Sequence, residues 1–152
     1  MDQSDIRLLH ALAKDAGVTA TKLMDKVNLS IPAVNKRIAR LKESGTIRNV
    51  TILTNPDKVG KSVIAFVLVV LDRFSNMDTI LKGVEADRDV LECYAVTGEY
   101  DYLLKICAPD IATLENKLLR LKEKGISRSH TMLALCEHKY APTVLPDLEN
   151  GR

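Results

Sequence analysis

Apolar residues recur every three or four positions in three short segments among residues 1–50, which is the spacing of amphipathic helices. The pattern predicts a first helix that is capped by Ser4 and stops by Gly17, and a second that is capped by Thr19. The predicted apolar stripes are Ile6, Leu9, Leu12 and Ala13 in the first helix, and Leu23, Met24 and Val27 in the second.

The third segment has well-marked ends. Ser30 is a suitable N-cap, Pro32 is tolerated in the first turn, and Gly45 is a typical stop, so we expect a helix of about 20 Å. Its polar residues lie opposite an apolar stripe: Lys36 and Arg40 point outward, flanked by Asn35 and Arg37, and the stripe contains Ile31, Val34, Ile38 and Leu41.

A tight join, Asn28-Leu29-Ser30, separates the second and third helices. Two short helices joined in this way form a helix-turn-helix, and the first helix completes a three-helix core. We therefore predict a helix-turn-helix domain over residues 1–50, followed by a β-rich linker over 51–61 that contains the turn-forming Asn55-Pro56-Asp57.

Strand and helix patterns alternate in the remainder. The expected elements are a strand over 62–72, a helix from about Asn76, strands over 90–97 and 101–108, a helix from Asp110 to Gly125 and a strand over 127–139. The order βαββαβ predicts a ferredoxin-like domain over 62–152, with both helices on one face of an antiparallel sheet. The fold class is therefore α+β.

The first of these strands is apolar at nearly every position from Val63 to Val70, which indicates that both of its faces are covered. Two helices on one side of the sheet leave the other side open. A second copy of the same sheet would cover it, so we predict a homodimer.

Charge is distributed unevenly. Residues 1–50 hold nine Lys or Arg and five Asp or Glu, whereas the rest of the chain holds 13 and 15. The third helix therefore fits the DNA major groove: Asn35 suits an adenine edge, Lys36 and Arg40 suit guanine or phosphate, and Ser30 suits a phosphate oxygen. The alternative is a merely solvated basic face. The predicted DNA-contacting residues are Ser30, Pro32, Asn35, Lys36, Arg37 and Arg40.

Other chemistry is weakly represented. His130, Cys136 and His138 share a strand face, but the two histidines lie about 27 Å apart along an extended strand, so we predict no metal site. Cys93 and Cys107 lie on adjacent predicted strands, either as reduced thiols or as a redox pair. We find no catalytic motif, and predict a non-enzymatic protein without a cofactor. The longest apolar run is too short to cross a bilayer and no secretory pattern is present, so we expect a cytoplasmic location.

The chain resembles the Lrp/AsnC, or feast/famine, family of transcription regulators over nearly its whole length. The resemblance is carried by Leu29-Ser30, Val34, Arg37-Ile38, Leu41, Gly45-Thr46-Ile47, Gly60, Phe66-Val67 and the run Thr97 to Leu104. It implies an N-terminal helix-turn-helix, a C-terminal effector domain, and dimers that often assemble into tetramers or octamers.

The resemblance also implies a small effector, commonly an amino acid, bound near the glycine-aspartate hairpin. It points to Thr97, Gly98, Glu99, Tyr100 and Asp101, and secondarily to Ser129 and Thr131. A glycine turn can offer N–H groups to the carboxylate of an amino acid, and Asp101 or Glu99 can meet its ammonium. The alternative is that Gly98 supplies only a positive φ and that its neighbours are solvated.

Three functions remain open at this point. The first is a DNA-binding transcriptional regulator that responds to a small effector. The second is an effector-independent architectural DNA-binding protein. The third is a small amino-acid-binding modulator protein in which the N-terminal third of the chain is only a packing module. The salt dependence of DNA binding separates the third from the others.

Overall fold

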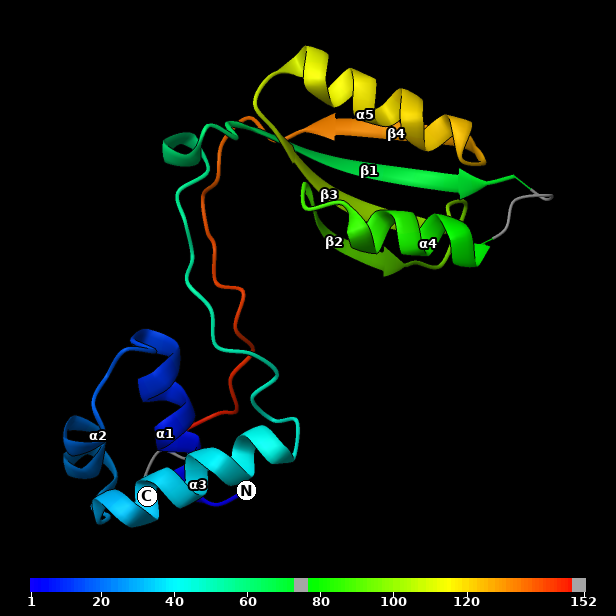
Figure 1. Cartoon of the computed structure of the whole chain (residues 1–152). Helices are drawn as coiled ribbons and strands as arrows, with labels where there is room; N and C mark the ends of the chain where they lie inside the picture. Colours follow the sequence, from blue (N-terminus) through cyan, green and yellow to red (C-terminus); the bar gives the residue numbers. More distant parts are fainter. Residues whose placement is uncertain (73–76, 149–152) are drawn as a thin grey trace. The chain divides into compact units, whose positions relative to one another are not determined.

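The computed structural model describes residues 1–72 and 77–148, and the chain divides into two compact units (Figure 1). The first contains Met1–Leu53 together with the chain from Lys139 onward, and the second contains Thr54–His138. The second domain was predicted over 62–152, and the described residues after His138 group with the helical unit.

Three helices form the first unit: α1 (Gln3–Lys14), α2 (Ala20–Val27) and α3 (Ile31–Glu43). The predicted cap of α1 was wrong, since Asp2 and not Ser4 occupies that position. Asp2 and Asp5 cap each other reciprocally: the Asp5 N–H donates to Asp2 Oδ1 at 2.9 Å, and the Asp2 N–H donates to Asp5 Oδ2 at 3.2 Å. Thr19 caps α2 as predicted, accepting from the Lys22 N–H.

Two predicted stripes need correction. The core of the unit contains Leu8, Ala11, Leu23, Val27 and Val34. The buried face of α1 is thus centred one position away from the predicted stripe, and Ala13 is exposed. At the start of α3, Ile31 is 38% exposed, while Val34 and Leu41 are buried as expected.

The chain turns sharply between α2 and α3 because Asn28 adopts the left-handed conformation, with φ 54°. Asparagine tolerates this conformation better than most residues. This geometry ends α2 and allows α3 to begin at Ile31, so the predicted helix-turn-helix is confirmed in its element order.

No strand forms over residues 46–54, although the composition of this segment is β-rich. The segment is followed by the short helix η1 (Asp57–Val59), which ends at Gly60 with φ 73°. A high β-propensity produces a strand only where a partner supplies backbone hydrogen bonds, and within the described chain this segment has none in a ladder.

The second unit contains one antiparallel sheet with strand order β2-β3-β1-β4. Its strands are β1 (Val63–Leu71), β2 (Val90–Ala95), β3 (Tyr102–Ala108) and β4 (Ile126–Leu133), and its helices are α4 (Met77–Ala86) and α5 (Ile111–Glu123). The βαββαβ order is confirmed. The last strand ends six residues earlier than predicted, and Asn76, the expected start of α4, lies outside the described residues.

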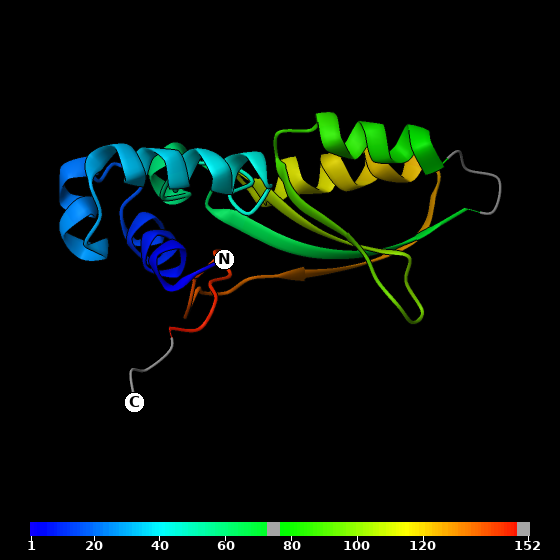
Figure 2. The ribbon, with the colours of Figure 1, turned by 90° about the horizontal axis from the view of Figure 1, so that it is seen from below.

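Both helices cover the same face of the sheet (Figure 2). Ala65, Val67 and Val69 of β1 are fully buried beneath them, whereas the alternate residues Phe66 and Leu68 are half-buried on the open face. On this open face, Tyr94 of β2 is 55% exposed. Among the described residues, no helix has the length and apolar character needed to span a bilayer.

Candidate nucleic-acid interface and hairpin pocket

The outer face of α3 holds most of the predicted DNA-contacting side chains. Ser30, Pro32, Asn35, Lys36 and Arg40 are all exposed. Although Ser30 is the N-cap of α3 by position, its side chain makes no capping hydrogen bond. The hydroxyl group is therefore not committed to the helix terminus and remains suited to an external acceptor.

Arg37 differs from its neighbours because it is bound within the unit. Its Nη1 donates to Asp2 Oδ2 at 2.6 Å and to Asp5 Oδ1 at 2.8 Å, and its side chain is only 25% exposed. The hydrogen bonds that Arg37 donates to the carboxylates of Asp2 and Asp5 raise its pKa. The structure therefore places Arg37 at the junction of α3 with α1 rather than on the free outer face.

Arg40 is both paired within the unit and exposed on the outer face of α3. Its Nη2 donates to Asp5 Oδ2 at 2.6 Å, yet 60% of its side chain is exposed. Asp5 itself is 0% exposed and is the one buried charged residue among those described. Burial raises the pKa of Asp5, but hydrogen bonds from Arg37 and from the Asp2 amide outweigh burial, and the pKa lies below its usual value.

Asp5 is not among the site residues that the sequence predicted. Its spacing of three residues from Asp2 is the available signal, because an acidic residue at the third helical position often completes a capping box. Nothing in the sequence alone indicates that two arginines more than 30 positions away converge on it.

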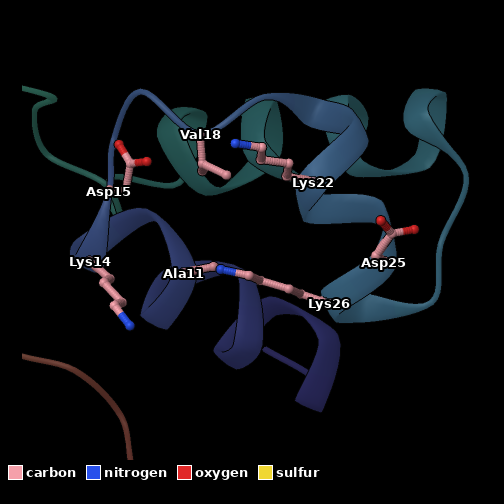
Figure 3. Close-up of a pocket in the computed structure, with 7 residues that line it drawn as sticks. All are labelled: Ala11, Lys14, Asp15, Val18, Lys22, Asp25 and Lys26. Carbon is pink, nitrogen blue, oxygen red and sulfur yellow. The ribbon is translucent and has the colours of Figure 1, made fainter.

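A separate groove of about 490 Å³ lies between α1 and α2 (Figure 3). Lys14, Lys22 and Lys26 line it together with Asp15 and Asp25, over the apolar floor of Ala11 and Val18. The mixture of both charges gives this groove no strong preference for an anion.

The hairpin between β2 and β3 holds five of the predicted effector residues. It is closed by a hydrogen bond of 3.0 Å from the Val96 N–H to the backbone oxygen of Asp101. Gly98 has φ 111°, and nothing lies within 4 Å of the position a Cβ would take. Glycine is needed here for the backbone conformation rather than for close packing.

Asp101 anchors this hairpin to β1. Its N–H donates to the Val69 oxygen at 2.9 Å, and its Oδ2 accepts from the Leu71 N–H at 2.8 Å. The latter bond lies beside the register shift between Val70 and Leu71. One carboxylate oxygen of Asp101 is thus already engaged by backbone.

The predicted residues on β4 do not join the hairpin. Ser129 and Thr131 lie opposite Val69 and Val67, so their side chains belong to the face that the helices cover. The preceding residue, Arg128, reaches the hairpin instead: its guanidinium lies 5.0 Å from the centre of the Tyr100 ring, and its Nη2 donates to the backbone oxygen of Glu99 at 3.2 Å.

A pocket of about 430 Å³ adjoins the base of the hairpin. Its lining consists of Leu71, Asp72, Met77, Val96, Asp101 and Tyr102. The Tyr102 hydroxyl donates to Met77 Sδ at 3.2 Å. The pocket has the size of a small-molecule site and combines apolar walls with two carboxylates.

The cysteines do not form a pair. Cys93 lies opposite Leu104 on β3, whereas the amide of Cys107 bonds to the Asp89 oxygen at the far end of the same ladder. Burial raises the pKa of both thiols, which favours their unreactive protonated form. Cys136 Sγ lies 3.2 Å from His138 Nε2, and no group of three metal-ligating residues occurs in the described chain.

Comparison with known proteins matches both units. Residues 1–48 match the model for winged helix-turn-helix DNA-binding domains, and residues 64–144 match that for the Lrp/AsnC ligand binding domain. The leucine-responsive regulatory protein of Escherichia coli is 32% identical over 148 residues, covering 91% of this chain and 87% of that protein.

Solved structures agree with this match. An AsnC family transcriptional regulator from Agrobacterium tumefaciens is 30% identical, covers 95% of this chain and 96% of its own, and superposes with a TM-score of 0.87. The feast or famine regulatory protein of M. tuberculosis, solved in complex with L-methionine, is 28% identical, covers 95% and 99% of the two chains, and has a TM-score of 0.88.

Proposed function

Because the chain belongs to the Lrp/AsnC family of DNA-binding transcriptional regulators, we propose that α3 enters the major groove and that an amino acid bound at the β2–β3 hairpin modulates DNA binding. The observation that carries the DNA part is the exposed face of α3, with Asn35, Lys36 and Arg40 on one well-packed helix. A groove about 12 Å wide accepts one such helix. The proposed role is non-catalytic and cytoplasmic.

Within this interface, the exposed residues divide by chemistry. Asn35 and Arg40 carry the donors and acceptors that recognise base edges, and Lys36 supplies a positive charge for phosphate. Ser30 and Pro32 lie at the N-terminal end of α3, where the helix dipole favours a phosphate oxygen. Arg37 lies behind this face, where it pairs with Asp2 and Asp5.

Salt titration of the Lys36→Ala variant tests the assignment of α3. A phosphate contact contributes close to one unit to the slope of log affinity against log salt, so we expect weaker binding and a slope reduced by about one. Lys122→Ala, an exposed lysine on α5 in the other unit, is the matched control and should retain the wild-type slope. Fluorescence anisotropy with duplex DNA gives both values, and an unchanged slope for Lys36→Ala contradicts the assignment.

The L-methionine complex of the M. tuberculosis relative supports the choice of an amino acid as effector. Here Val96 and Asp101, at the two ends of the hairpin, line the pocket, and the exposed residues Thr97, Gly98 and Glu99 lie between them in the chain. Glu99 is suited to the ammonium of the ligand, since Asp101 already accepts the Leu71 N–H. Arg128, which holds Tyr100 and Glu99, joins the proposed site, whereas Ser129 and Thr131 lie outside it.

A thermal-shift screen against the twenty amino acids tests the effector assignment. A ligand at 100 times its dissociation constant stabilises the folded state by about 2.7 kcal/mol, which is an easily measured rise in melting temperature. Glu99→Gln should abolish the rise without changing the melting temperature of the free protein, because Glu99 is exposed. Retention of the full shift in that variant contradicts the role of Glu99.

We further propose that two copies pair through the open face of the sheet. Phe66, Leu68 and Val70 of β1 lie on this face, next to Tyr94 and Met132, which are 55% and 42% exposed. Exposed apolar side chains gathered on one sheet face are typical of an interface. Assembly of such dimers into tetramers or octamers belongs to the same proposal.

A further inference from the structure

The carboxylate of Asp5 is surrounded by donors from two helices. It accepts from the Asp2 amide at 3.2 Å, from Arg37 Nη1 at 2.8 Å and from Arg40 Nη2 at 2.6 Å. Both of its oxygens are engaged, and the side chain is 1% exposed. A capping box needs only the first of these contacts, so capping alone does not account for the two arginines.

The two arginines are held to different degrees. Arg37 is bound by two carboxylates and is mostly buried, whereas Arg40 is bound by Asp5 alone and is 60% exposed. The contact with Asp5 uses one of the five N–H donors of the Arg40 guanidinium. Arg40 lies one turn after Lys36 on the exposed face of α3.

An exposed arginine ordinarily samples many rotamers, and ordering it on DNA costs conformational entropy. A fixed carboxylate behind the guanidinium removes most of that freedom before DNA arrives. The carboxylate also balances the positive charge of the guanidinium, so the attraction of Arg40 to any phosphate becomes weaker. The remaining N–H donors of the guanidinium can still bind the edge of a base. The arrangement therefore favours sequence discrimination over general affinity.

We propose that Asp5 is a positioning residue for DNA recognition, which orients Arg40 for a guanine edge and suppresses its non-specific attraction to phosphate. This inference rests on the proposed entry of α3 into the major groove. Asp2 has no such role, because it contacts Arg37 and not Arg40. The two aspartates thus provide a matched pair of variants within one cluster.

The test compares two duplexes of equal length: one enriched by the wild-type protein from a random pool, and a scrambled version of it. Asp5→Asn should lower the ratio of the two affinities roughly tenfold, the loss expected when one good base contact is no longer ordered. It should also steepen the salt slope on the scrambled duplex, because the charge of Arg40 is released. Asp2→Asn should have the same affinity ratio and the same salt slope as the wild type.

A double-mutant cycle assigns the effect to Arg40. Arg40→Lys keeps the charge and loses the planar fork, so it should lower discrimination by itself, and adding Asp5→Asn to it should lower discrimination no further. Additive losses, or equal losses for Asp2→Asn and Asp5→Asn, would show that Asp5 acts only through the stability of the unit and would overturn the proposal.

One measurement needs no variant of Asp5. In the free wild-type protein, NMR relaxation of the Arg40 Nε–H bond should give an order parameter close to that of Arg37 and well above that of exposed Arg7. A disordered Arg40 side chain overturns the proposal even if Asp5→Asn fails to fold. Absence of sequence-dependent binding in the wild-type protein would instead reject the proposed function, so the two failures are distinguishable.

Discussion

At the scale of single residues, a buried carboxylate joins α1 to α3. Removing a charge from water is costly, and Asp5 tolerates burial because two guanidinium groups and an amide surround it. Neutralising one member of such a cluster leaves the others without their partner. The stability of the helical unit should therefore depend on the protonation of Asp5.

This dependence predicts a specific pH profile. The pKa values of Asp2 and Asp5 lie below the ordinary 3.8 in the folded protein. As the pH falls, the unfolded chain therefore binds protons before the folded protein does. The stabilisation is complete above the ordinary pKa and is lost as the pH falls through the folded pKa. Asp5→Asn should melt at a lower temperature than the wild type at pH 7.

Melting curves from pH 7 to pH 2.5, followed by circular dichroism, check the profile. The gap between the wild type and Asp5→Asn should narrow below about pH 4, as the wild-type carboxyl group becomes neutral. Other aspartates also have lowered pKa values, including Asp87, Asp89 and Asp110, but they are common to both proteins and cancel in the difference. A gap that stays constant with pH would show that the charge of Asp5 is not what stabilises the unit.

At the scale of elements, the helix starts show that the N-cap position does not always carry a capping hydrogen bond. Asp110 Oδ1 accepts from the Thr113 N–H at 2.6 Å and so caps α5, whereas Ser30 occupies the same position on α3 without a capping hydrogen bond. Asp110→Ala should therefore lower the free energy of unfolding by about 1 kcal/mol. Ser30→Ala should change stability by much less than this.

DNA binding should rank these two variants in the opposite order. Ser30→Ala removes a hydroxyl from the proposed phosphate contact and should weaken binding, while Asp110→Ala, in the other unit, should not. Urea unfolding and anisotropy on the same samples give the comparison. Equal destabilisation by both variants would mean that Ser30 caps α3 in solution.

The elements also show what the sequence could predict. The helix-turn-helix and the βαββαβ order follow from periodicity and from capping and turn residues such as Thr19, Asp110 and Gly45, all of which act locally. The apolar stripe of α1 was misplaced because Asp5, a charged residue, occupies the core position one turn before Leu8. The strand ends depend on partner strands, so β4 stops at Leu133 and residues 46–54 form none.

In the candidate sites too, features set by local sequence could be predicted and features set by distant residues could not. The exposure of Asn35 and Lys36 could be predicted because it follows from the helical period alone. The ion pairs of Arg37 and the exclusion of Ser129 from the hairpin depend on residues distant in the chain and on strand register. Long-range pairing of this kind has no local signal in one sequence.

At the scale of the whole molecule, one face of the sheet is left open within a single chain. Within the described residues, α4 and α5 cover one face, and the other keeps Phe66, Leu68 and Tyr94 at least partly in water. Burial of apolar surface is favourable by about 25 cal/mol per Å², so a second copy of this face is the economical cover. Lys105 and Glu92 form an ion pair of 3.0 Å on the same face and limit where apolar contact occurs.

Leu68→Glu tests this pairing, because Leu68 lies on the open face of β1, one of the two inner strands of the sheet. A carboxylate there would be buried without a partner in the dimer, which should convert the protein to a monomer in sedimentation velocity. Leu119→Glu is the control: Leu119 lies on α5, is 51% exposed, and receives the same charge away from the open face. It should sediment as the wild type does.

The two variants also connect assembly to function. Two helix-turn-helix units joined in a dimer contact half-sites about one duplex turn apart, so loss of the dimer removes one half of the contacts. Leu68→Glu should therefore bind DNA much more weakly with about half of the wild-type salt slope, while Leu119→Glu keeps the full slope. A folded Leu68→Glu that remains dimeric would exclude the open face as the interface and require another surface to bring two α3 helices together.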